Sequence, residues 1–259
     1  MTDLPPASSP AVTPVVANAD EPALAKKAPA KLREAPKWGV EARERVKAAI
    51  RRYSKPLADL MARDANEGDT RLLVTDFLTD ALGYDKYDDL TTEYSVKGEF
   101  ADYGIRIDKQ LTAFIEVKRC TTKLGPKHLR QVEMYAVNEG VEWIVLTNGG
   151  TWQVYHVTGG LPVVIDLAFD VDLLSAETVS QKAAELFFLT RDAMKRRLID
   201  ELWKAKAAMS PKSLGKVLLR AEVLDVIRKE LRRSTGQNVD VKELAGVLRE
   251  TVLRPECLD

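Results

Sequence analysis

Asp102, Glu116 and Lys118 have the residue types and the spacing needed for metal-assisted chemistry. On a strand, side chains alternate between faces, so Glu116 and Lys118 share a face while Val117 points the other way. If a neighbouring antiparallel strand places Asp102 opposite Glu116, their Cβ atoms lie about 4.5–5.5 Å apart. Two carboxylates that close repel each other unless a cation neutralises them. We therefore expect a divalent cation between them.

Mg²⁺ is the expected ion, with Mn²⁺ as a substitute, because Mg²⁺ takes oxygens from one or two carboxylates and keeps sites for water and phosphate. The Val117 carbonyl offers a further oxygen ligand. A divalent ion at this place polarises a phosphodiester and lowers the pKa of a bound water. Lys118 can orient that water or offset charge on the phosphate. The residues thus predict phosphodiester hydrolysis, although a solvated hairpin face has the same spacing and stays open as an alternative.

The elements that must position these residues are two short apolar segments, 103–107 and 111–115, separated by the triplet Asp108-Lys109-Gln110. This pattern predicts two antiparallel strands joined by a tight turn. With the turn centred on Lys109, the pairing brings Asp102 opposite Glu116.

The rest of the chain alternates between helical and strand patterns, which predicts an α/β fold with a central mixed sheet of about five or six strands flanked by helices. Pro56 is expected to kink or divide the first helix. Helices are predicted over 40–62, 70–82 and 127–138, strands over 92–96, 142–147, 151–157 and 161–167, and C-terminal helices over 175–209, 213–233 and 240–253.

Composition divides the chain into three parts: a Pro- and Ala-rich N-terminal tail (1–37) that we expect to be disordered, a core (38–168) and a helical C-terminal region (169–259). The formal net charge is zero, so global charge neither indicates nor excludes a nucleic-acid partner. Two cysteines and two histidines without a CxxC motif exclude a structural zinc site. No apolar run is long enough for a membrane span or a secretory signal, so we expect a cytoplasmic protein without membrane partners.

The order of these motifs resembles the PD-(D/E)xK nuclease superfamily, and more narrowly the N-terminal nuclease domain of the R subunit of type I restriction enzymes in a stand-alone form. The resemblance covers about 66–165 and rests on Asp102, on Glu116-Val117-Lys118, and on flanking segments. These segments are Leu82-Gly83-Tyr84, the Gln131/Tyr135 helix, and Thr147-Asn148-Gly149 followed by Trp152.

The resemblance implies that Asp102 and Glu116 bind Mg²⁺, that Lys118 assists catalysis, and that Glu67 on the first core helix joins the site. Gln131 and Tyr135 lie one turn apart on one helix face, where an amide and a phenol could hold a phosphate or a base; alternatively, Tyr135 packs and Gln131 is solvated. The resemblance associates this pair with nuclease function. Ala101 stands where the superfamily has its proline, and this change removes no ligand. The chain has no GxxxxGK[ST] phosphate loop, so we expect no ATP-driven translocation along DNA.

DNA is the expected partner, with separate restriction-system subunits or further copies of the chain as possible additions. Three basic residues near the site, Arg119, Lys123 and Lys127, could contact neighbouring phosphates or serve only surface solubility. Residues 191–233 carry thirteen Lys or Arg against six Asp or Glu, which fits a solvated helical face or a phosphate-contacting surface equally well. The alternative function is a catalytically silent nucleic-acid-binding or oligomeric assembly protein on the same fold.

Overall fold

The computed structural model describes residues 36–96, 99–160 and 162–258, together with all of their side chains except those of Val96, Glu99 and Gln131. The predicted disordered tail lies outside these residues up to position 35 and stays a prediction.

Six strands form one mixed sheet in the order in which they occur along the chain, β1-β2-β3-β4-β5-β6. Every neighbouring pair is antiparallel except β3 and β4, which are parallel and are connected by α3 (Pro126–Glu139). This architecture confirms the predicted α/β fold with a mixed sheet. The strands are β1 (Leu90–Val96), β2 (Glu99–Ile107), β3 (Gln110–Val117), β4 (Trp143–Thr147), β5 (Thr151–Thr158) and β6 (Val164–Asp172).

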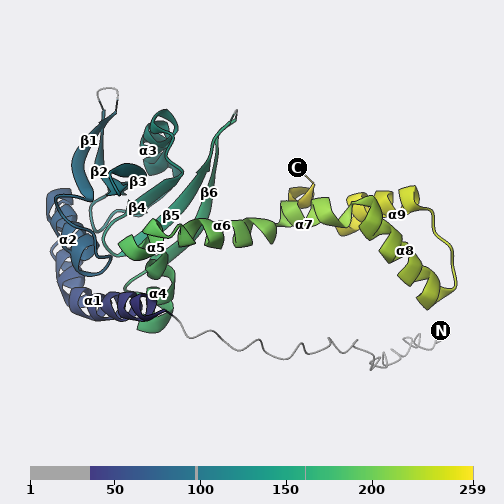
Figure 1. Cartoon of the computed structure of the whole chain (residues 1–259), viewed down its shortest axis with the longest axis horizontal. Helices are drawn as coiled ribbons and strands as arrows, with labels where there is room; N and C mark the ends of the chain where they lie inside the picture. Colours follow the sequence, from purple (N-terminus) through teal and green to yellow (C-terminus); the bar gives the residue numbers. More distant parts are fainter. Residues whose placement is uncertain (1–35, 97–98, 161, 259) are drawn as a thin grey trace, which may run out of the picture. The chain divides into compact units, whose positions relative to one another are not determined.

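Helices cover both faces of the sheet, as Figure 1 shows for α3 on one side and for α1 (Lys37–Ala62) and α2 (Glu67–Asp80) on the other. Alternate residues of the central strands β3 and β4 pack against the helices on opposite faces of the sheet. Phe114 and Ile144 pack in the apolar cluster that contains α3, whereas Ile115 and Val145 pack in the cluster that contains α1 and α2. Burial on both faces explains why β4 is continuously apolar.

The N-terminal helices follow the predicted periodicity but differ from the prediction at their ends. Pro56 lies inside α1 without dividing it, because the helix continues to Ala62. α2 begins at Glu67, three residues earlier than expected, because the Asn66 side chain caps it by accepting a hydrogen bond from the Asp69 amide. Beyond its C-terminal end lies Gly83 with a left-handed φ of 78°.

The C-terminal region is helical as predicted, but it is divided into more segments than the three expected. Left-handed Arg197 (φ 55°) separates α5 from α6, and Ser210 and Arg220 begin new helices as N-caps. β6 continues past residue 168, where the core was predicted to end and the helical region to begin. The segments are α4 (Val179–Leu186), η1 (Phe187–Leu189), α5 (Arg191–Lys195), α6 (Leu198–Ala208), α7 (Pro211–Leu218), α8 (Ala221–Thr235), α9 (Val241–Val247), η2 (Leu248–Val252) and η3 (Pro255–Cys257).

Within the described parts of 36–258, none of the helices has both the length and the apolar character needed to span a bilayer.

Candidate active site

The β2–β3 hairpin brings the two predicted acidic residues together. Tyr103 pairs with Ile115 and Gly104 with Phe114, and continuing this register by one residue puts Asp102 opposite Glu116. Side chains of opposed residues are neighbours on a sheet, so their negative charges influence each other: the charge of Asp102 contributes to raising the pKa of Glu116. The predicted register of the acidic pair therefore agrees with the structure.

Asp102 is a nearly buried carboxylate held by one hydrogen bond and one ion pair. Its Oδ2 accepts a hydrogen bond of 2.7 Å from the Val117 amide, and its Oδ1 lies 3.3 Å from the Arg71 guanidinium. Burial raises the pKa of Asp102 although the Val117 hydrogen bond and the charges of Arg71 and Lys118 oppose that effect. The protein environment alone therefore does not fully compensate the ionised form of Asp102.

Glu116 has one carboxylate oxygen with a partner and one without. Lys118 Nζ donates to Glu116 Oε1 at 2.5 Å, which confirms that the two side chains share a face. Glu116 Oε2 is buried and has no hydrogen-bond partner among the described residues. Because buried polar atoms are almost always satisfied, this oxygen lacks a bond that a ligand from outside the protein could supply. Burial, and to a smaller extent the charge of Asp102, raise the pKa of Glu116.

Lys118 is a protonated ammonium at neutral pH. Desolvation lowers its pKa, but the hydrogen bond to Glu116 and the charges of Glu116, Glu67 and Asp102 together raise it above the usual value. Lys118 is therefore suited to donate hydrogen bonds rather than to take a proton.

Glu67 and His128 approach the same place from two helices. Glu67 begins α2, and its charge contributes to raising the pKa values of Asp102 and Lys118. His128, in the first turn of α3, accepts a hydrogen bond of 3.2 Å from the Gly125 amide on Nδ1. Burial and then the charges of Lys127 and Lys118 lower the pKa of His128. Glu67 and His128 therefore lie near enough for their charges to influence, or be influenced by, the acidic pair and Lys118. The role of Glu67 in the site stays a prediction.

Sequence reasoning missed Arg71 and His128. Arg71 follows Glu67 by four residues, so the two share one face of α2; this spacing was the available signal. For His128 the signal was its position just after Gly125-Pro126, the helix start that faces the end of β3.

The helix pair Gln131/Tyr135 is only partly placed. The Gln131 side chain lies outside the described side chains. Tyr135 is buried in the α3 layer, where its ring packs edge-on against Phe114 at 6.3 Å between centroids. Packing is therefore a role of Tyr135 that the structure supports directly, and its contact with a substrate stays a prediction.

The three predicted phosphate-contacting residues have different surroundings. Arg119 binds the loop before α2, donating from Nε to the Ala65 carbonyl at 3.0 Å and pairing with Asp64 at 2.6 Å. Lys123 and Lys127 are exposed. The Arg119 guanidinium is therefore already bound to this loop, although 43% of its side chain is exposed, whereas the two lysines are exposed on the surface.

The donor set fits Mg²⁺ better than a metal that needs many protein ligands. Among the described residues, no group of three or more His, Cys, Asp or Glu side chains lies close enough together to hold a metal ion. Asp102 and Glu116 nevertheless provide two adjacent carboxylates, one of which has the unpartnered oxygen. Mg²⁺ needs only one or two carboxylates when water and phosphate complete its coordination.

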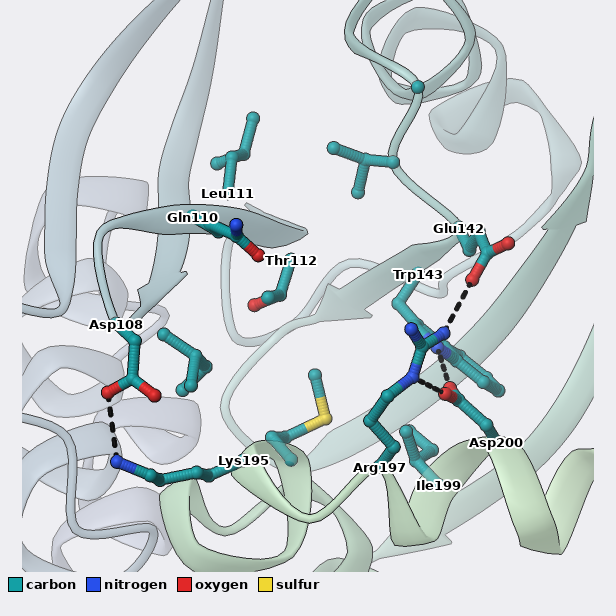
Figure 2. Close-up of a pocket in the computed structure, with 14 residues that line it drawn as sticks. Asp108, Gln110, Leu111, Thr112, Glu142, Trp143, Lys195, Arg197, Ile199 and Asp200 are labelled. Atoms are coloured by element: carbon teal, nitrogen blue, oxygen red, sulfur yellow. Dashed lines mark hydrogen bonds and ion pairs between the residues drawn. The ribbon is translucent and has the colours of Figure 1, made fainter.

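A cavity of about 430 Å³ lies at the opposite end of β3 and β4 (Figure 2). It contains none of the predicted site residues. Ion pairs between Asp108 and Lys195 and among Glu142, Arg197 and Asp200 border it. This cavity and the acidic pair are therefore separate features of the sheet.

Residues 66–161 match the family model described as "Type I restriction enzyme R protein N terminus". This match confirms the resemblance inferred from the motifs. The matched segment contains Glu67, Arg71, Asp102, Glu116 and Lys118. Comparisons with curated proteins and with solved structures gave no significant match.

Proposed function

We propose that the protein is a Mg²⁺-dependent endodeoxyribonuclease that hydrolyses DNA phosphodiester bonds in restriction of foreign DNA. The observation that carries the proposal is the buried, unpartnered Oε2 of Glu116 beside Asp102 and Lys118. The match of the surrounding segment to the N terminus of type I restriction enzyme R proteins supports it.

Each residue of the site has a distinct task in this proposal. Asp102 Oδ1 and Glu116 Oε2, with the Val117 carbonyl, would hold the metal, which polarises the scissile phosphate and lowers the pKa of a water when it is bound. Lys118, kept protonated by its acidic neighbours, donates a hydrogen bond that orients the attacking water or offsets charge on the phosphate. Glu67 adds negative charge that favours a cation at this place. In-line displacement leaves a 5′-phosphate, as in the nucleases that the chain resembles.

Cleavage of supercoiled and linear DNA by the full chain in Mg²⁺, Mn²⁺ or EDTA tests the proposal. We expect cutting in Mg²⁺ and Mn²⁺, no cutting in EDTA, and a loss of at least about a hundredfold in Asp102→Ala and in Lys118→Ala. Lys55→Ala is the matched control, because Lys55 is an exposed lysine on α1. Cutting that survives in both site variants would contradict the assignment.

Other outcomes would favour the alternative functions. Retained DNA binding without cleavage in any metal would indicate a catalytically silent nucleic-acid-binding protein, or a nuclease that requires a separate restriction-system subunit. Absence of both binding and cleavage, together with a concentration-dependent size, would indicate an oligomeric assembly protein.

A further inference from the structure

Arg71 lies beside Asp102, where it would compete with a metal ion for the carboxylate. Its Nη1 lies 3.3 Å from Asp102 Oδ1 and 3.7 Å from Glu93 Oε1. Helical side chains lean toward the helix N-terminus, so Arg71 leans over the turn that begins with Glu67. The guanidinium is therefore the cation paired with Asp102, as the Lys118 ammonium is the cation paired with Glu116.

The backbone of Arg71 is fixed independently of its side chain. Its carbonyl accepts hydrogen bonds from Thr75 Oγ1 at 2.8 Å and from Tyr103 Oη at 3.1 Å. Because Tyr103 is the β2 residue next to Asp102, these bonds hold α2 against the acidic strand. The Arg71 side chain, about one third exposed, can change partners without moving the helix.

A divalent cation and a guanidinium cannot both be close to one carboxylate oxygen without repelling each other. Asp102 Oδ2 already uses one lone pair to accept from the Val117 amide, whereas Oδ1 has only the ion pair with Arg71, so Oδ1 has the greater remaining capacity for the ion. Binding of the ion would therefore release the guanidinium from Asp102. A guanidinium presents its donors in a planar fork that matches phosphate oxygens, so a DNA phosphate is the fitting new partner.

We propose that Arg71 is a phosphate-binding residue whose availability depends on the metal: it pairs with Asp102 in the metal-free protein and contacts a DNA phosphate when a divalent ion binds Asp102. This inference rests on the proposed nuclease function. It differs from a merely structural ion pair, which would give Arg71 no metal-dependent contribution to DNA affinity.

Metal binding without DNA is the first part of the test. Ca²⁺ titration of the full chain by calorimetry compares the wild type with Arg71→Gln, Arg71→Lys and Glu116→Gln. Arg71→Gln removes the competing charge, so we expect Ca²⁺ to bind about two- to fivefold more tightly, the range for loss of one half-exposed ion pair. Arg71→Lys keeps the charge and is expected to stay close to wild type, whereas Glu116→Gln weakens binding.

DNA affinity with and without metal is the second part. Binding of a short DNA duplex is measured in Ca²⁺ and in EDTA. In Ca²⁺, Arg71→Gln is expected to lose about tenfold in affinity, as for one charge-assisted hydrogen bond. In EDTA, we expect no difference from wild type. Arg52→Gln is the matched control, because Arg52 pairs with an exposed aspartate, Asp80, on the outer side of α1 and α2 and should change neither measurement.

The outcomes separate the inference from the proposed function. If the wild type binds Ca²⁺ and DNA but Arg71→Gln loses DNA affinity equally in Ca²⁺ and EDTA, or binds Ca²⁺ less tightly, the inference is wrong and the nuclease proposal stands. If the wild type binds neither Ca²⁺ nor Mn²⁺, the nuclease proposal fails and the inference fails with it. Thermal unfolding of each variant shows whether a loss comes from misfolding.

Discussion

The two ends of the parallel strand pair β3–β4 differ in whether their charged groups have partners. At the end that begins these strands, the cavity is bordered by charged groups with partners: Lys195 pairs with Asp108 at 2.9 Å, and Asp200 accepts from Trp143 Nε1 at 2.9 Å as well as from Arg197. At the other end, Asp102 and Glu116 have raised pKa values and Glu116 Oε2 has no partner among the described residues.

This difference supports the view that unsatisfied polarity, rather than empty volume, marks the end of the sheet at which we propose the chemistry. A cavity bordered by mutually neutralising charges needs no ligand to complete it. A buried carboxylate oxygen without a donor has a cost that persists only if something else bonds to it or if function requires it. Substitutions at the two ends should therefore separate activity from stability.

The largest effect is expected for Glu116→Gln. The amide keeps the shape of the side chain but removes the charge, so DNA cleavage in Mg²⁺ should fall by at least about a hundredfold. Because burial already disfavours the ionised form of Glu116, the free energy of unfolding at pH 7 should be at least as high as in the wild type. Urea unfolding beside a cleavage assay measures both quantities, and a variant that is inactive because it is markedly less stable would remove the contrast between the two ends.

Asp200→Ala should have the opposite effects, lowering stability and leaving cleavage unchanged. It removes the acceptor of the Trp143 indole and the partner of Arg197, and the indole N–H then loses its hydrogen bond, so the free energy of unfolding should fall by about 2 kcal/mol. Cleavage per folded molecule should be unchanged, since Asp200 lies at the cavity end.

Glu201→Ala provides the control on the same helix. Its ion pair with Lys204 is exposed, so stability should stay within about 0.5 kcal/mol of wild type. A cleavage defect in Asp200→Ala that exceeds its folding defect would show that the cavity end takes part in the reaction.

The pH dependence of stability should also differ between the two ends. Folding raises the pKa of Glu116 above its ordinary value of 4.5 and raises that of Asp102 above 3.8, so the folded protein holds these protons more tightly than the unfolded chain does. Their contribution to stability is complete below the ordinary values and is lost as the pH rises through the raised values. The double variant Asp102→Asn, Glu116→Gln should lack this loss, whereas Asp200→Ala should retain it. If the free energy of unfolding changed with pH in the same way in the wild type and in the double variant, from acid to neutral pH, the raised pKa values would be contradicted.

The position of the acidic pair could be predicted because it depends on local pattern. Strand alternation fixed Glu116 and Lys118 on one face, and hairpin pairing brought Asp102 opposite. The prediction of a turn centred on Lys109 was wrong in detail. The observed turn consists of two residues, Asp108 and Lys109, with left-handed φ values of 50° and 69°, and this shifts the pairing next to the turn by one residue. An irregularity between Ile105 and Arg106 reverses the shift, so the register beyond it agrees with the prediction.

The surroundings of the pair could not be predicted because they depend on how distant elements dock. The contact of Arg71 with Asp102 requires α2 to pack on β2, and the bonds of Arg119 join residues more than fifty positions apart. No pattern within a single segment carries such information. Charge alone therefore suggested that Arg119 was available to DNA, although its guanidinium holds the loop at Asp64 and Ala65.

The smallest effect, Lys109→Gly, tests the hairpin at the cavity end. A two-residue turn with positive φ at both positions favours glycine at the second, because a side chain there crowds the backbone. The replacement should raise the free energy of unfolding by up to about 1 kcal/mol, reduced in part by the greater freedom of glycine in the unfolded chain. Lys109→Ala keeps a Cβ atom and should leave stability close to wild type. If glycine destabilised the protein more than alanine did, Lys109 would not have its left-handed conformation in solution. The turn would then be centred on Lys109, and the Asp102–Glu116 register would follow without the irregularity between Ile105 and Arg106.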